Sequence, residues 1–203
     1  MFIQIIQGKC SKQDEMRALT DRWNAELAPG ATGWLGGTFG FTDDGQAVAV
    51  VRFESREAAM ANSERPEQAA WWAEAERLYD GPVEFHDCNR VTLMMDGGSD
   101  EAGFVQIIRG KLDDPDAIEA GMRDMESMLH EARPDILGAT LAIEDDGTFM
   151  ETIFFTDEAA AREAEAKPME DNTEAAEMMR QWDEMTRDVQ YLDLHHPWFA
   201  SKL

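Results

Sequence analysis

Arg52 and His86 carry the side chains in this sequence that are best suited to anion and acid–base chemistry. Arg52 alternates with Val48 and Val50 in a strand-like segment, and His86 lies in another, VEFHD. A guanidinium within a strand can stabilise an anion, and an imidazole titrates near neutral pH and can act as a general base. We predict both as catalytic residues. The alternatives are an exposed ion pair for Arg52 and an incidental position at a strand end for His86.

Two amides and a C-terminal imidazole form a second set of candidates, for ligand binding. Gln4 and Gln106 each lie between apolar residues, so a buried amide there needs a polar cavity or a partner on a neighbouring strand. His195 lies beside aromatic residues in LHHPWF. Because His195 and His196 are adjacent in an extended segment, they point to opposite sides and cannot readily share a metal ion. No zinc-type spacing occurs either, and we expect no metal site.

The charge balance argues against whole classes of partner. The 203 residues include 42 Asp and Glu against 18 Lys and Arg, which gives a net charge of -24. Such a surface repels phosphate backbones and anionic headgroups, so we expect a small-molecule ligand and neither nucleic acid nor a membrane as partner. Two cysteines without ligand spacing, and an N-terminus that lacks the pattern of a signal peptide, favour a reducing cytoplasm.

An internal repeat supplies the domain organisation. FIQIIQGK at 2–9 returns as FVQIIRGK at 104–111, and at the same shift of 102 residues LGGTFGFTDDG at 35–45 aligns with LGATLAIEDDG at 137–147. Near its end the second copy gains four residues. We predict three parts: a first repeat at 1–95, a Gly-rich acidic linker at 96–103 and a second repeat at 104–203.

Comparison of the two copies separates shared from unshared polar residues. Gln4 and Gln106 occupy the same position, so the common fold itself can require them. The alignment places apolar residues opposite three others: Arg52, His86 and Glu151. Polar residues that occur in only one copy are freer to serve a function.

Each copy predicts the same six elements in the same order. In the first copy they are a strand at 2–6, a helix after an N-cap at Ser11, strands at 35–41 and 46–54, a helix from Ser55 to Tyr79 interrupted at Pro66, and a strand at 83–87. In the second they are a strand at 104–108, a helix after Asp114 and Pro115, strands at 137–143 and 148–156, a helix from Asp157 to Arg187 interrupted at Pro168, and a strand at 189–194. An Asp-Asp-Gly turn joins the middle strands of each copy. This order is the ferredoxin-like pattern.

A four-stranded sheet with both helices on one face leaves its other face uncovered, so two copies should bury these faces against each other. The duplicated pattern resembles the dimeric α+β barrel superfamily, which includes antibiotic-biosynthesis-monooxygenase-type proteins, haem-degrading monooxygenases and chlorite-dismutase-like enzymes. The resemblance implies an α+β fold of two tandem ferredoxin-like βαββαβ units whose antiparallel sheets join in one barrel around a cavity. Here both units lie in one chain, so we expect a monomer with pseudo-twofold symmetry, with a homodimer as the alternative.

The resemblance also implies a function. A protein of the antibiotic-biosynthesis-monooxygenase type would oxidise or rearrange a small aromatic or polyketide-like compound without a bound cofactor. His86 would then help to ionise the substrate, and Arg52 would stabilise the resulting anion. In the superfamily the second helix of each unit borders the cavity, which makes Trp72 and Trp182 candidates for stacking on a flat ligand. Core packing is the alternative for both tryptophans.

Two further alternatives follow from the same resemblance. Haem-dependent members use an asparagine on the first strand, together with a tryptophan and a histidine. This chain has Gln4 and Gln106 at that place, which disfavours haem. The second alternative is a non-catalytic small-molecule-binding or stress-associated barrel protein.

Overall fold

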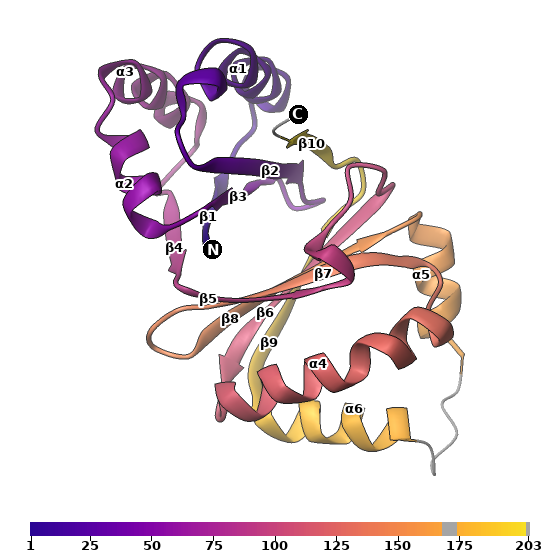
Figure 1. Cartoon of the computed structure of the whole chain (residues 1–203). Coiled ribbons are helices and arrows are strands. Elements are labelled where there is room, and N and C mark those ends of the chain that lie inside the picture. The colour runs from indigo at the N-terminus through magenta and orange to yellow at the C-terminus, as the bar shows by residue number, and fades with distance from the viewer. Residues whose placement is uncertain (168–173, 202–203) are drawn as a thin grey trace. The chain divides into compact units, whose positions relative to one another are not determined.

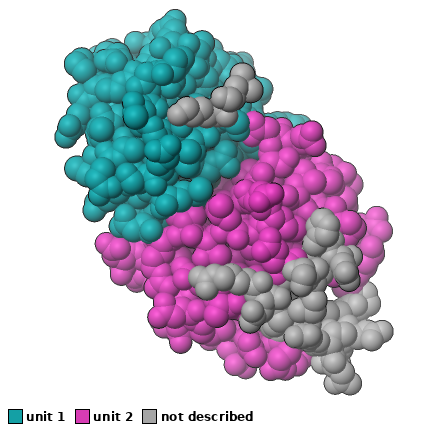
Figure 2. Space-filling model, viewed as in Figure 1, with its two compact units in different colours: residues 1–89, 196–203 teal, residues 90–195 magenta. Residues whose placement is uncertain are grey.

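The computed structural model describes residues 1–167 and 174–201, and the chain forms two compact units (Figure 2). Unit 1 comprises residues 1–89 and 196–203, and unit 2 comprises residues 90–195. The α+β class and the two ferredoxin-like units predicted from the sequence are confirmed. No helix in the described part of the chain is both long and apolar enough to span a membrane.

Unit 1 contains a five-stranded antiparallel sheet in the order β10-β2-β3-β1-β4. Its strands are β1 (Phe2–Lys9), β2 (Trp34–Phe41), β3 (Gln46–Phe53), β4 (Glu84–Cys88) and β10 (Trp198–Ser201). Its helices are α1 (Gln13–Glu26), α2 (Arg56–Ser63) and α3 (Pro66–Ala75), with short 3-10 helices at Ala28–Gly30 and Glu76–Leu78. The three α-helices lie on one side of this sheet (Figure 1).

Unit 2 repeats this arrangement with a sheet in the order β5-β7-β8-β6-β9. Its strands are β5 (Arg90–Met94), β6 (Phe104–Leu112), β7 (Ile136–Ile143), β8 (Thr148–Phe155) and β9 (Thr186–Leu194). Its helices are α4 (Pro115–Ala132), α5 (Glu158–Glu165) and α6 (Glu174–Met185), with a 3-10 helix at Met95–Gly97. Figure 1 shows α4 and α6 running along one side of this sheet.

The fifth strand of each sheet comes from the end of the other repeat. Strand β5 follows β4 in the chain but pairs with β7 of unit 2, and β10 follows β9 but pairs with β2 of unit 1. Neither strand was among the elements expected from the sequence. Both are short, their sequences RVTLM and WFAS do not resemble each other, and their partners are distant in the chain. The two sheets are therefore each completed by a strand exchanged between the repeats.

Most of the predicted helix and turn signals are confirmed. The side chains of Ser55, Asp114 and Asp157 accept backbone hydrogen bonds at the start of α2, α4 and α5. The predicted N-cap at Ser11 is wrong, because α1 starts later and the Ser11 hydroxyl donates to the Asp80 carboxylate at 2.9 Å. Asp80 follows the last turn after α3, so this competing partner comes from a distant part of the sequence.

The ends of the second helices differ from the prediction in two places. The interruption at Pro66 is confirmed, but α3 ends at Ala75 and continues only as a 3-10 turn instead of reaching Tyr79. In the second copy the helix ends at Met185 instead of Arg187, because the next strand starts at once. The interruption predicted at Pro168 lies outside the described residues.

The predicted hairpins are confirmed in both repeats. β2 pairs with β3 and β7 with β8 in antiparallel register. The turns need a residue that tolerates positive φ, and Gly45 and Gly147 both adopt φ +82° there. Each hairpin supplies two neighbouring strands, so its side chains alternate between the helix-covered face and the opposite face of the sheet.

Candidate functional site

The helix-covered face of the unit 2 sheet borders a cavity of about 610 Å³. Apolar side chains from the five strands of the sheet and from α4 and α6 form most of its wall. The polar residues at the floor come from β6, β8 and β9. The lining includes Gln106, Met122, Glu151, Ile153, Trp182 and Asp193. A cavity of this size, largely apolar with a few polar groups, has the character of a small-molecule site.

Glu151 is the most unusual residue of this cavity. It lies on the central strand β8, between Ile108 of β6 and Leu141 of β7, and is only 8% exposed. No residue in the described part of the chain donates a hydrogen bond or forms an ion pair with its carboxylate. Burial disfavours the charged form and raises the pKa of Glu151 to about 7. This carboxyl group can therefore release and take up a proton near neutral pH, as a general base or acid requires.

A hydrogen-bonded chain of three side chains lies beside Glu151 on the floor. The Gln106 amide nitrogen donates to the Asp193 carboxylate at 2.8 Å. The other oxygen of Asp193 accepts a hydrogen bond from the Arg162 guanidinium, which also donates to Glu165 at 3.1 Å. These hydrogen bonds link β6, β9 and α5 and hold the Gln106 amide in one orientation.

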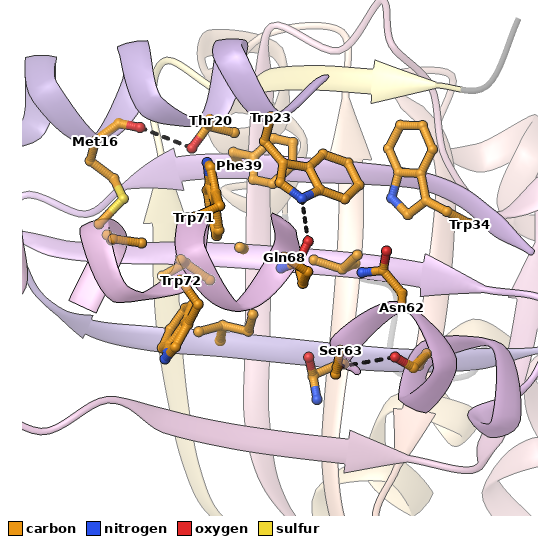
Figure 3. A pocket seen from close by; sticks show the side chains of 18 of the residues that line it. Met16, Thr20, Trp23, Trp34, Phe39, Asn62, Ser63, Gln68, Trp71 and Trp72 are labelled. Carbon is orange, nitrogen blue, oxygen red and sulfur yellow. Dashed lines mark hydrogen bonds between the residues drawn. The ribbon is translucent and has the colours of Figure 1, made fainter. Parts of the chain in front are cut away.

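The corresponding face of unit 1 borders a cavity of only about 100 Å³ (Figure 3). Its lining includes Gln4 and no charged side chain among the described residues. Indole rings fill most of the space: the ring centroids of Trp23 and Trp34 are 5.2 Å apart, and those of Trp23 and Trp71 are 6.5 Å apart. Trp23 also donates to the Gln68 side chain at 2.6 Å (Figure 3). Unit 1 therefore resembles a packed core more than a ligand site.

His86 and Arg52, the predicted catalytic residues, line neither cavity. His86 pairs with Ile5, and Arg52 pairs with Ile3. Because side chains alternate along β1 and Gln4 faces the helices, all four lie on the opposite face of the sheet. The guanidinium of Arg52 lies against the backbone where Gly36 has no side chain: a Cβ there would be 2.6 Å from the Arg52 Nη2 atom.

His86 also has a local partner in unit 1. His86 is 7% exposed, and its Nε2 atom lies 3.4 Å from a carboxylate oxygen of Glu84. Strand β1 separates β4, which carries His86, from β3, which carries Arg52. The structure does not bring these two residues together with either cavity, and their catalytic roles stay predictions.

The residues predicted to bind a ligand are divided between the two units. Gln106 and Trp182 line the large cavity, and Gln4 and Trp72 line the small one. Both glutamine amides also donate a hydrogen bond to a neighbouring strand, so each glutamine both lines a cavity and has a partner on that strand. His195 lines neither cavity: its Nδ1 atom lies 2.7 Å from the Glu158 carboxylate.

Glu151 carried a signal in the sequence that could have singled it out. It is one of the polar residues that the first repeat lacks, since Ala49 stands at the matching position. Position in a strand alone does not say which face a residue occupies or how deeply it is buried. His86 is as deeply buried as Glu151, so it is the face of the sheet that distinguishes Glu151, which lines a cavity, from Arg52 and His86, which do not.

The residues present do not fit a haem. No histidine lines either cavity in the parts of the chain that the structure describes, so an iron held there would lack an imidazole ligand. The first-strand glutamines are also engaged, since each amide donates to an aspartate on the neighbouring strand.

No family model and no curated protein matches this sequence. Several solved structures share its fold over nearly the full length. A candidate monooxygenase from Lactobacillus acidophilus gives a TM-score of 0.74 at 10% identity, covering 100% of this chain and 97% of that one. Another, from Fusobacterium nucleatum subsp. nucleatum, gives 0.75 at 10% identity, covering 99% and 94%. An anthrone oxidase-like protein gives 0.65 at 8% identity, covering 99% and 94%.

These similarities establish the fold and confirm the resemblance at that level. The chain has the duplicated ferredoxin-like fold found in proteins described as monooxygenases. At identities of 8 to 10% the activity and the substrate do not follow from the fold. The cavity and its side chains are the features of this chain that bear on activity and substrate.

Proposed function

We propose that the protein is a monooxygenase-like enzyme that oxidises a small aromatic or polyketide-like compound with dioxygen, without a bound cofactor, in the cavity of unit 2. The observation that carries this proposal is Glu151, a buried carboxyl group with a pKa of about 7 on the floor of a cavity of about 610 Å³. The shared fold of proteins described as monooxygenases supports the reaction class. The name of the anthrone oxidase-like neighbour suggests a probe for the chemistry.

The proposed reaction converts an activated CH₂ group to a carbonyl group. Ionised Glu151 takes one proton from that CH₂ group, which leaves an electron-rich carbanion. The carbanion transfers electrons to dioxygen and forms a carbon–oxygen bond, which gives a hydroperoxide after protonation. Loss of water from the hydroperoxide yields the ketone, so that R₂CH₂ and O₂ become R₂C=O and H₂O. No external reductant is needed, because the substrate itself supplies the electrons.

The walls of the cavity provide the binding surface for such a compound. Trp182 of α6 presents an aromatic face, and Ile153 and Met122 are apolar neighbours in the same lining. Apolar walls also keep water away from the carbanion. Under this proposal the base predicted at His86 is replaced by Glu151, since His86 lies on the opposite face of the other sheet.

Oxygen consumption with anthrone tests the proposal. We expect the purified protein, with nothing added, to accelerate anthrone oxidation and to consume one O₂ per anthraquinone formed. The rate should rise with pH through about 7, because the base acts in its ionised form. Glu151→Gln should lower the rate about 100-fold or more, while Glu163→Gln, an exposed residue of α5, should not change it.

Two results would contradict the proposal. If Glu151→Gln keeps full activity while His86→Ala loses it, the base belongs to unit 1. If anthrone binds in the cavity but is oxidised no faster than in buffer, the protein is a small-molecule-binding module rather than an oxidase of this substrate class.

A further inference from the structure

We infer that Asp193, held by Arg162, positions the Gln106 amide so that the cavity floor presents hydrogen-bond acceptors to the ligand and selects aromatic compounds that carry hydroxyl or amino donors. This inference deepens the proposed function and rests on it in one respect: the cavity of unit 2 is the ligand site. It assigns a positioning role to the Asp193–Arg162 pair and a specificity-determining role to Gln106.

The orientation of the Gln106 amide follows from its partner. Its nitrogen donates to Asp193 at 2.8 Å. A carboxylate only accepts hydrogen bonds, so the amide nitrogen, and not the oxygen, must face Asp193. The amide oxygen is then turned away from Asp193. No residue in the described part of the chain donates to that oxygen, and Gln106 lines the cavity. A ligand that meets Gln106 therefore meets an acceptor.

Arg162 keeps the carboxylate of Asp193 in position to accept the hydrogen bond from Gln106. The guanidinium donates to the second oxygen of Asp193, so the carboxylate is held from one side by Arg162 and from the other by Gln106. Arg162 is itself held by Glu165 and lies 5.1 Å from the ring centroid of Phe104. A charged hydrogen bond fixes the acceptor more firmly than a neutral one.

Glu151 is the second acceptor on the same floor. Gln106 of β6 pairs with Ile153 of β8, and Ile108 of β6 pairs with Glu151, so the two acceptors are diagonal neighbours on adjacent strands. Diagonal neighbours on one face of a sheet lie about 7 to 8 Å apart, with their Cβ atoms somewhat closer. One fused aromatic ligand can therefore reach both with donors at two ends.

The charges around the cavity disfavour anionic ligands. Arg133 makes two hydrogen bonds to the Asp135 carboxylate, and Arg162 is engaged by Asp193 and Glu165. The two positive charges among the described lining residues are thus already matched, and in the same part of the chain the carboxyl group of Glu151 has no partner. A carboxylate on the ligand would add another negative charge to this region. The ligand class is an uncharged aromatic donor.

Unit 1 carries the same amide and acid in a different setting. The Gln4 amide donates to Asp87 at 2.8 Å, but the guanidinium of Arg56 lies 3.8 Å from Asp87, beyond hydrogen-bond distance. Its cavity of about 100 Å³ has an alanine, Ala49, where unit 2 has the second acceptor. If the glutamine–aspartate pair only joined two strands, Asp87 and Asp193 would be equivalent. Asp87→Asn is therefore a matched control for Asp193→Asn.

The test compares two naphthalene probes that share the ring system and the positions of their oxygen substituents, under anaerobic conditions. One is 2,7-dihydroxynaphthalene, which carries two donors, and the other is 2,7-dimethoxynaphthalene, which has none. We expect the wild-type protein to bind the dihydroxy probe at least tenfold more tightly, as measured by calorimetry. Asp193→Asn lets the Gln106 amide turn over, because an asparagine can donate to its oxygen. The preference should then fall below about threefold, whereas Asp87→Asn should leave it unchanged.

A second variant covers the case in which Asp193→Asn does not fold. Gln106→Leu should weaken binding of the dihydroxy probe and leave binding of the dimethoxy probe unchanged. Equal affinities of the two probes for the wild-type protein would overturn the inference, as would equal effects of Asp87→Asn and Asp193→Asn on the preference. Because these measurements need no turnover, a protein that keeps the preference but does not oxidise anthrone contradicts only the proposed reaction.

Discussion

At one position of the central strand, unit 1 carries Ala49 and unit 2 carries Glu151. The surrounding positions differ in the same sense. Trp34 of unit 1 corresponds to Ile136 of unit 2, so the larger side chain lies in the unit that contains Ala49. The added strands continue the trend, since Trp198 pairs with Phe39 in unit 1. These rings leave about 100 Å³ open in unit 1, against about 610 Å³ in unit 2.

The difference shows how one copy of a duplicated domain can keep a densely packed core while the other copy contains an open cavity. Both copies keep the sheet order, the hairpin and the glutamine–aspartate pair, so these features belong to the common fold. The cavity of unit 2 measures about 610 Å³ and includes the buried carboxyl group of Glu151, whereas that of unit 1 measures about 100 Å³ and has no charged side chain among its described lining residues. Large aromatic side chains stabilise unit 1 by burial, and a buried charge and an open cavity both reduce the stability of unit 2. Under the proposed function, the ligand site is in unit 2 and the more densely packed core is in unit 1.

Replacing either Trp34 or Ile136 by its counterpart in the other unit should give the largest difference in stability between the two units. Trp34→Ile opens a hole among packed indole rings and should lower the free energy of unfolding by about 3 to 4 kcal/mol. Ile136→Trp extends into the existing cavity of unit 2 and should change it by less than about 1 kcal/mol. Denaturant unfolding of both variants checks this. Equal costs would show that the two cavities are packed alike.

The buried carboxyl group of unit 2 should also make the free energy of unfolding depend on pH, with a slightly smaller effect. The folded protein keeps the Glu151 proton up to pH about 7, whereas a glutamate in the unfolded chain releases it near pH 4.5. Folding is therefore favoured by this group below pH 4.5, and that contribution is lost as pH rises to 7, by about 3 kcal/mol in total.

The measurement compares unfolding free energies of the wild-type protein and Glu151→Gln at pH 5 and pH 8. The variant should be the more stable protein at pH 8 and should gain little at pH 5. Glu163→Gln, which changes an exposed carboxylate, should follow the wild type at both values. A wild-type pH profile that Glu151→Gln does not alter would place the Glu151 carboxyl group in water.

Much of this fold follows from local signals in the sequence. The repeat, the Asp-Asp-Gly turns and the caps at Ser55 and Asp157 depend on neighbouring residues, and the structure confirms them. Strands β5 and β10 could not be found in this way, because their short segments are strands only through partners far away in the chain. The cap at Ser11 failed for the same reason, since its partner Asp80 is almost 70 residues distant.

The candidate site was predictable only in part. Gln106 was identified from its residue type and position and Trp182 from the family resemblance, and both line the large cavity. Arg52 and His86 have the chemical groups expected of a catalytic site but lie on the other face of their sheet. Glu151 has an ordinary side chain whose pKa is raised by burial alone. That shift depends on the depth of a position in the folded sheet, which a sequence pattern does not contain.

The most direct test of this account is to observe which unit a ligand enters. Five of the six tryptophans lie in unit 1, and the sixth, Trp182, lies on the wall of the unit 2 cavity. A ¹⁵N–¹H spectrum of the indole groups, with the Trp182 signal assigned by Trp182→Phe, can be recorded during titration with 2,7-dihydroxynaphthalene. The account predicts that the Trp182 signal shifts while the other five stay in place. Shifts confined to the unit 1 signals would contradict it.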